Sequence, residues 1–202
     1  GSSRHHPAEP LYRESDALES LHYLQGMPFE QVFEPVPGLR TRFRRQGHIL
    51  GAAAVTCELE GAKLTFSGDL GRPDDPVMLA PDPPLDSDWI VAESTYGNRR
   101  HPEMSLKDEL REILLRVFAR NGVVVIPSFA VGRAQLLLHV IAQMQSEGEI
   151  PAEPVYLNSP MAADVSGLYR QYPHLHRLDA AALDQMRNTV RVVTTVEYYI
   201  GG

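Results

Sequence analysis

The spacing of apolar residues changes near residue 102, so the two halves of this 202-residue chain are expected to fold differently. Between Val32 and Glu93 the apolar segments are short, rich in β-forming residues, and separated by Gly, Pro and Asp. After residue 102, long segments with helical spacing alternate with short apolar runs, which favours a parallel sheet. The sequence therefore predicts an α/β protein with a β-rich part, residues 1–101, and a helix–strand part, residues 102–202.

The β-rich part is expected to contain one short helix and several strands. Apolar residues at helical spacing in "ESDALESLHYLQGM" predict the helix. Four runs predict strands: "LRTRFRR", "AAVTCELE", "AKLTF" and "DWIV", the last of them buried. Trp89 is expected in the core; the alternative is that Trp89 and Tyr96 stack on bases. The link "EGAK" is typical of a hairpin turn. Residues 71–88 are rich in proline and predict an irregular connection.

The helix–strand part begins with the amphipathic segment "SLKDELREILLRVFAR", where Ser105 and Asp108 suit a capping box and the following "NG" suits a helix end. The continuous apolar run "VVVIP", residues 123–127, predicts a buried strand. A helix, a strand and a helix are expected in "GRAQLLLHVIAQMQ", "PVYLN" and "AADVSGLYRQY". "HLHRLD", with His174 and His176, follows a predicted helix and a proline and is interpreted as a solvated surface stretch.

Composition excludes several classes of protein. No apolar run reaches the roughly 18 residues of a membrane span, so no membrane partner is expected. The single cysteine, Cys57, rules out an internal disulfide framework and favours a reducing cytoplasm. The net charge of −7 argues against a chain that coats nucleic acid over its whole surface, although a local basic groove stays compatible with it.

Three polar residues follow predicted strands or turns where a core would not need them. His48 lies between Gly47 and a small apolar turn, Asp69 follows the strand "AKLTF", and Glu93 follows "DWIV". Strands that end on the same side of a sheet bring such groups together. Histidine and aspartate are ligands for Zn²⁺ or Mn²⁺, and an aspartate can bridge two ions. Each residue alone is more typical of a structural histidine or a turn-forming aspartate; the combination indicates an active site.

The segment "PSFAVGRAQ" joins a predicted strand to a predicted helix. Backbone N–H groups at such a helix start suit a phosphate, and Arg133 adds a charged fork. Ser128 and Arg133 are therefore candidate RNA- or phosphate-binding residues. In the alternative interpretation Ser128 is a helix N-cap, Gly132 makes the turn and Arg133 packs internally.

The motifs together resemble a known family. "GHILGAA", "FSGDLGR" and "ESTYGNRRH" resemble three consecutive motifs of metallo-β-lactamase-fold nucleases of the β-CASP group, and "IPSFAVGRAQ" and "YLNSPMA" resemble the start of the β-CASP insertion. The family members most like it are bacterial and archaeal relatives of the nuclease subunit that cleaves eukaryotic pre-mRNA 3′ ends. The resemblance implies that residues 1–101 are a partial metallo-β-lactamase β-sandwich with helix layers, and that residues 102–202 are the N-terminal part of a β-CASP domain.

The resemblance also implies residue roles. His48 matches a histidine ligand of one of two zinc ions, and Asp69 matches the carboxylate that bridges both; manganese is an open alternative. Glu93 matches the acidic motif that begins the β-CASP part, so Asp69 and Glu93 are the candidate catalytic residues. The implied reaction is metal-dependent hydrolysis of phosphodiester bonds in single-stranded RNA, in RNA processing or decay.

One departure from the family pattern is clear in the sequence. The family's H-x-H-x-D-H signature is not found in these 202 residues, nor are the histidine motifs that follow the β-CASP segment. We therefore expect an internal piece of a longer nuclease, inactive alone and binding metal weakly or not at all. The alternatives are a non-catalytic module that binds RNA or a partner, or a small-molecule metallo-hydrolase. Exposed edges of an incomplete sheet would favour a homo-oligomer.

Overall fold

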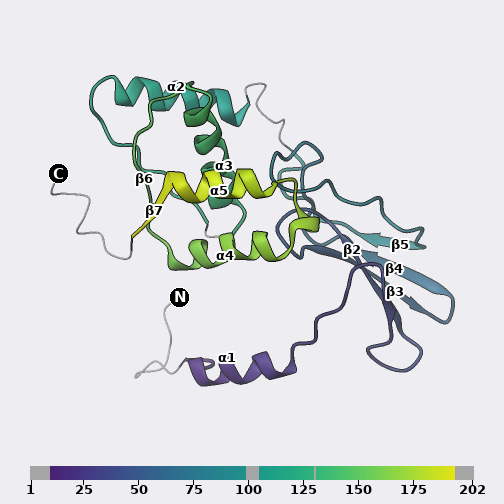
Figure 1. Cartoon of the computed structure of the whole chain (residues 1–202). Coiled ribbons are helices and arrows are strands. Elements are labelled where there is room, and N and C mark those ends of the chain that lie inside the picture. Colours follow the sequence, from purple (N-terminus) through teal and green to yellow (C-terminus); the bar gives the residue numbers. More distant parts are fainter. Residues whose placement is uncertain (1–9, 99–104, 130, 194–202) are drawn as a thin grey trace.

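The computed structural model describes residues 10–98, 105–129 and 131–193. A β-sheet from the first half of the chain lies on one side, and a group of helices from the second half lies on the other (Figure 1). The α/β prediction is therefore confirmed. Within the described residues no helix is long and apolar enough to cross a membrane.

The sheet contains five strands in the order β1-β2-β3-β4-β5. All neighbouring strands are antiparallel except β4 and β5, which are parallel. The predicted hairpin turn is confirmed, because Glu60 and Gly61 both take positive φ angles between β3 and β4. The strands span the following ranges: β1 Val32–Phe33, β2 Arg40–Arg45, β3 Ala53–Leu59, β4 Ala62–Phe66 and β5 Trp89–Val91.

In the β-rich part the predicted N-terminal helix is present, whereas the predicted burial of β5 is not observed. The predicted N-terminal helix is α1, Glu14–Ser20, extended by the 3-10 turn η1, Leu21–Tyr23, and none of its residues is buried. The prediction that β5 is buried, with Trp89 in the core, is wrong: Trp89 is 61% exposed and all three β5 residues are exposed. β5 is one of the two edge strands of this sheet and, within the described residues, pairs with β4 alone.

The second half forms four helices and a two-stranded parallel sheet within the described residues. Ser105 caps α2 as predicted, because its Oγ accepts the Asp108 N–H at 3.1 Å. The last helix and strand, α5 and β7, lie beyond the elements that the sequence pattern predicted. The elements are α2 Leu106–Phe118, α3 Arg133–Ser146, β6 Val155–Leu157, α4 Pro160–Gln171, η2 Pro173–Leu175, α5 Ala180–Thr189 and β7 Val190–Val192.

The prediction of a buried strand at residues 123–127 is wrong. This segment is neither helix nor strand, and Val123 and Val125 are exposed. Val124 alone of its valines packs partly against the core cluster formed by α2 and α3. A strand needs a neighbour for its N–H and C=O groups, and residues 123–127 pair with no strand in the described part of the chain.

The irregular connection between β4 and β5 supplies part of the helical core. Val77 and Met78 are 1% and 4% exposed and belong to the cluster that helices α3, α4 and α5 form. Asp75 fixes this turn, because its Oδ1 accepts the N–H groups of Val77 and Met78 at 2.8 and 2.7 Å. The connection was predicted to be irregular, which is confirmed; its burial was not predicted.

The segment around His176 packs against this connection. His176 and Leu178 are buried, so the interpretation of "HLHRLD" as solvated surface is wrong for these two residues. His176 Nε2 donates to Tyr169 O at 2.7 Å, and its Nδ1 accepts the Leu178 N–H at 3.1 Å. The Arg177 N–H donates to Val77 O at 2.8 Å. His176 is therefore a structural histidine with both ring nitrogens bonded.

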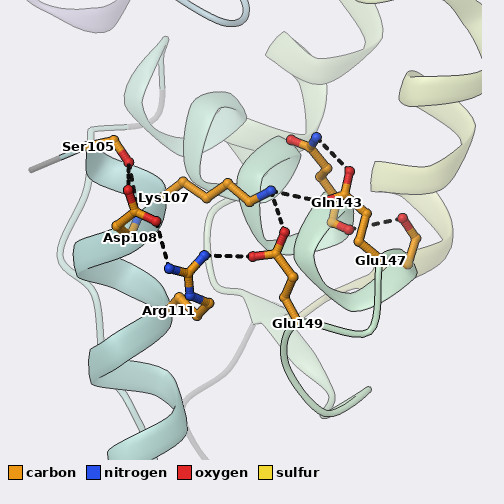
Figure 2. Close-up of polar contacts among 8 residues, drawn as sticks. Ser105, Lys107, Asp108, Arg111, Gln143, Glu147 and Glu149 are labelled. Carbon is orange, nitrogen blue, oxygen red and sulfur yellow. Dashed lines mark hydrogen bonds and ion pairs between the residues drawn. The ribbon is translucent and has the colours of Figure 1, made fainter.

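An ionic network holds α2 against the end of α3 (Figure 2). Glu149 accepts from Lys107 Nζ at 2.6 Å and from Arg111 Nη1 at 2.8 Å. Lys107 also pairs with Glu147, and Arg111 with Asp108. Hydrogen bonds from Lys107, followed by those from Arg111, lower the pKa of Glu149 to about 2.

We predict that Met78→Ala destabilises the protein by about 2–5 kcal/mol, because it leaves a cavity in the core that joins the two parts. Met161→Ala is the matched control, since Met161 is 62% exposed. Urea unfolding followed by circular dichroism measures both. Equal stability of the two variants would contradict the burial of Met78.

We predict that Glu149→Gln reduces the acid sensitivity of the fold. A carboxylate with a lowered pKa stabilises the folded state above its unfolded-state pKa and loses this contribution as pH falls. The wild-type free energy of unfolding should therefore drop between about pH 4.5 and about pH 2 more than that of the variant. Urea unfolding at a series of pH values measures this, with Glu112→Gln, an exposed glutamate of α2, as control.

Candidate active site

His48, Asp69 and Glu93 emerge at one edge of the sheet. β4 and β5 are parallel and end opposite each other at Phe66 and Val91, so the loops that carry Asp69 and Glu93 leave the same edge. The β2–β3 loop, which carries His48, also lies there, because Arg45 pairs with Ala53 and Val55 pairs with Phe66. The convergence expected from the sequence is thus observed in the backbone.

Glu93 holds the loop that contains Asp69. The Leu70 N–H donates to Glu93 Oε1 at 2.6 Å, and the Glu93 N–H donates to Ser67 Oγ at 3.0 Å. The hydrogen bond from the Leu70 N–H, then that from Thr95, lowers the pKa of Glu93, and the electrostatic interaction with His48 adds to this effect. Glu93 is therefore held ionised between the Asp69 loop and His48, while His48 and Asp69 themselves are exposed.

The loops that carry His48 and Asp69 approach each other so closely that their backbones form hydrogen bonds. The Gly71 N–H donates to Gln46 O at 2.8 Å, and Gly47 and Leu70 form an isolated β-bridge. A Cβ on Gly71 would lie 2.3 Å from the carbonyl carbon of Gly47, a distance that no side chain tolerates. Glycine at this position of "FSGDLGR" therefore lets the Asp69 loop pack directly on the His48 loop.

The start of α3 lies beside the His48 loop. A Cβ on Gly132 would lie 3.1 Å from Ile49 Cγ2 and 4.0 Å from His48 O. Arg133, the first residue of α3, is exposed at this junction. The structure thus brings the start of α3 and the histidine loop together, although they are far apart in the sequence.

The details of this helix start differ from the sequence interpretation. Gly132 is the N-cap, so the alternative interpretation of Ser128 as N-cap is wrong; Ser128 is exposed in the irregular segment before it. The Gly132 N–H donates to Gln135 Oε1 and the Arg133 N–H donates to Val131 O. These two N–H groups are used internally, so a phosphate bound here would not take its hydrogen bonds from them.

The described residues do not form a complete metal site. His48 and Asp69 are ligand types suited to zinc, but no group of three or more His, Cys, Asp or Glu residues that could hold a metal ion occurs in the described part of the chain. Zinc sites in proteins take three or four protein ligands.

Sequence reasoning missed two residues that build this region. Ser67 bridges the ends of β4 and β5, since its N–H donates to Val91 O at 2.9 Å and its Oγ accepts from Glu93. Gln135 is fully buried and caps Gly132. The signal for Gln135 was its place three residues after the helix N-cap, where glutamine often bonds the N-cap N–H.

Comparisons with known proteins found a matching domain family and several relatives. A model of the Beta-Casp domain matches residues 134–199. Ribonuclease TTHA0252 of Thermus thermophilus is 37% identical over 163 residues, which is 80% of this chain and 37% of that protein. Cleavage and polyadenylation specificity factor subunit 3 of Dictyostelium discoideum is 33% identical over 165 residues, 80% of this chain and 21% of that protein. Cleavage and polyadenylation specificity factor 73 of Drosophila melanogaster is 30% identical over 165 residues, which is 80% of this chain and 24% of that protein.

The fold and the site define an α/β protein whose candidate catalytic loops lie at one sheet edge, next to a helix start. The chain belongs to the β-CASP family of metallo-β-lactamase-fold proteins. It spans between 21% and 37% of the length of the three relatives named. The family implies a metal cofactor.

We predict that Gly71→Ala displaces the Asp69 loop from the His48 loop and destabilises the fold by about 1–3 kcal/mol, because the new methyl group meets backbone atoms. Gly26→Ala is the control, since a Cβ there meets nothing within 4 Å. Urea unfolding gives the stability, and amide chemical shifts of residues 46–48 report the displacement. Shifts in Gly71→Ala no larger than in the control would contradict the close approach.

Proposed function

We propose that this chain is part of a metal-dependent β-CASP ribonuclease that hydrolyses phosphodiester bonds of single-stranded RNA in RNA processing or decay. The observation that carries the proposal is the meeting of the His48, Asp69 and Glu93 loops with the start of α3. The names of the relatives, among them a ribonuclease of Thermus thermophilus, support the same reaction class. RNA is the proposed partner and the cytoplasm the proposed location.

Each candidate residue has a proposed role. His48 and Asp69 are proposed as metal ligands, for zinc ahead of manganese, completed by ligands outside the described residues. Glu93 is proposed to act at the catalytic centre, and its bond to the Leu70 N–H also keeps the Asp69 loop in place. Arg133 is proposed to hold an RNA phosphate through its guanidinium, with Ser128 on the approach to it.

The division of the chain also belongs to this proposal. Residues 1–101 would be the C-proximal portion of a metallo-β-lactamase-like domain and residues 102–202 the start of a β-CASP domain. The core around Met78 and Tyr169 would then be the contact between the two domains. Assembly into a homo-oligomer stays a prediction.

A second candidate function is a metal-free module that binds RNA or a partner without cutting it. The observation that favours it for this chain alone is the lack of a group of three metal-ligand residues in its described part. Metal-dependent cleavage separates the two candidates.

We predict that a longer protein, with the H-x-H-x-D-H segment placed upstream of this sequence, cleaves single-stranded RNA when zinc or manganese is supplied. Asp69→Asn in that protein should lower kcat by about 100-fold or more, because it removes a ligand of the metal that stabilises charge at the reacting phosphate. Such stabilisation commonly contributes that much. Asp86→Asn is the control, since exposed Asp86 lies before β5 at the end opposite Glu93. Cleavage is followed on a fluorescent oligonucleotide.

Cleavage that survives Asp69→Asn would contradict the role of Asp69. Failure of the unmodified longer protein to cleave RNA with either metal, while it still binds RNA, would favour the binding module.

A further inference from the structure

The turn before α3 has a backbone conformation that glycine adopts far more readily than other residues. Gly132 has φ 77° and ψ −66°, and the Arg133 N–H donates to Val131 O at 3.0 Å. These values define a γ-turn with a positive φ at its central residue, which is a rare turn type. A residue with a side chain would be strained in this conformation, so the turn requires glycine at position 132.

One buried side chain holds this turn. Gln135 is 0% exposed, and its Oε1 accepts the Gly132 N–H at 2.8 Å. Its Nε2 donates to Ala162 O at 3.1 Å and to Ser166 Oγ at 3.3 Å, and both partners belong to α4. The same carboxamide therefore fixes the γ-turn and connects it by hydrogen bonds to the first turns of the next helix.

The position of α4 is itself well defined. Ser159 caps it, because the Ser159 Oγ accepts the Ala162 N–H at 3.1 Å, and Pro160 occupies its first position. Ala162 is fully buried, and Ser166 Oγ donates to Ala162 O at 2.8 Å. The hydrogen bonds of Gln135 thus fix the turn before Arg133 relative to the "NSPMA" segment at the start of α4.

We propose that Gln135 is a positioning residue for RNA binding: by bridging Gly132 to Ala162 and Ser166, it orients the Arg133 guanidinium toward the phosphate that it binds. The inference rests on the proposed RNA-binding function. Gln135 does not touch RNA; it acts through the backbone of Gly132, whose neighbour carries the contact. An amide is the group that suits this place, because it supplies one acceptor and two donors without charge.

The test is a double-mutant cycle on the full chain. Dissociation constants for a fluorescein-labelled oligouridylate of about ten nucleotides are measured by anisotropy at low salt. The variants are Arg133→Ala, Gln135→Met, both together, and Gln143→Met. Methionine matches glutamine in length without its hydrogen bonds, and Gln143 lies on the same helix but donates to Glu147 outside this region.

We expect Arg133→Ala and Gln135→Met each to weaken binding by about tenfold, since each removes the same charge-assisted contact to phosphate. The double variant should bind no more weakly than Arg133→Ala, and Gln143→Met should bind as the wild type does. Circular dichroism verifies that each variant is folded.

The outcomes separate the two proposals. If Arg133→Ala weakens binding but Gln135→Met does not, or if the two effects add, the positioning role of Gln135 is overturned and the RNA site stands. If the wild type does not bind, or Arg133→Ala binds equally well, the proposed RNA site fails, and the role of Gln135 in it fails with it.

A conservative variant gives a readout that loss of packing would not produce. A carboxyl group in Gln135→Glu replaces the amide only when it is protonated, since its O–H then donates to Ala162 O; burial raises its pKa. Relative to the wild type, RNA affinity of Gln135→Glu should recover as pH falls from about 8 to about 5.5, whereas Gln135→Met should show no recovery. If the ratio of the RNA dissociation constants of Gln135→Glu and the wild type stays the same throughout this pH range, the positioning role is contradicted.

Discussion

The burial of Val77 and Met78 among helices α3, α4 and α5 connects the sheet to the helical part. These residues belong to a connection with no helix or strand, so their apolar side chains have no regular element of their own to stabilise them. Asp75 fixes the turn on one side, and on the other side the Arg177 N–H donates a hydrogen bond to Val77 O. Because this connection starts directly after the Asp69 loop, its anchorage also limits where that loop can lie.

Close backbone approach governs the candidate active site in the same way. Gly71 lets one loop rest on another, and Gly47 would place a Cβ only 2.1 Å from Leu79 O if it had one. The His48 loop therefore lies between residue 79, the Asp69 loop and the start of α3. Backbone segments that are far apart in the sequence meet there because the glycines leave room for them, and Glu93 adds a hydrogen bond to Leu70 of the Asp69 loop.

Much of the local structure could be predicted from the sequence. The alternation in residues 40–66 and the Glu60–Gly61 turn specify strands β2, β3 and β4, because side-chain period and turn chemistry are local properties. The segment 123–127 and Trp89 could not be placed correctly, since an apolar run reports a preference for burial and not whether a partner is present. His176 was misjudged for the converse reason: its hydrogen bonds to Tyr169 and Leu178 are made by tertiary packing, which satisfies a polar ring inside a core.

The sequence by itself determined the α/β class, the caps and turns, and the order of residues that identifies the family, because each depends on neighbours along the chain. It also indicated that His48, Asp69 and Glu93 would follow strands that end at one edge. The tertiary structure alone decided that α3 starts beside His48, that Gln135 holds the Gly132 turn against α4, and that Met78 lies in the helical core. These contacts join residues separated by up to about a hundred positions, and only the packed chain specifies such distances.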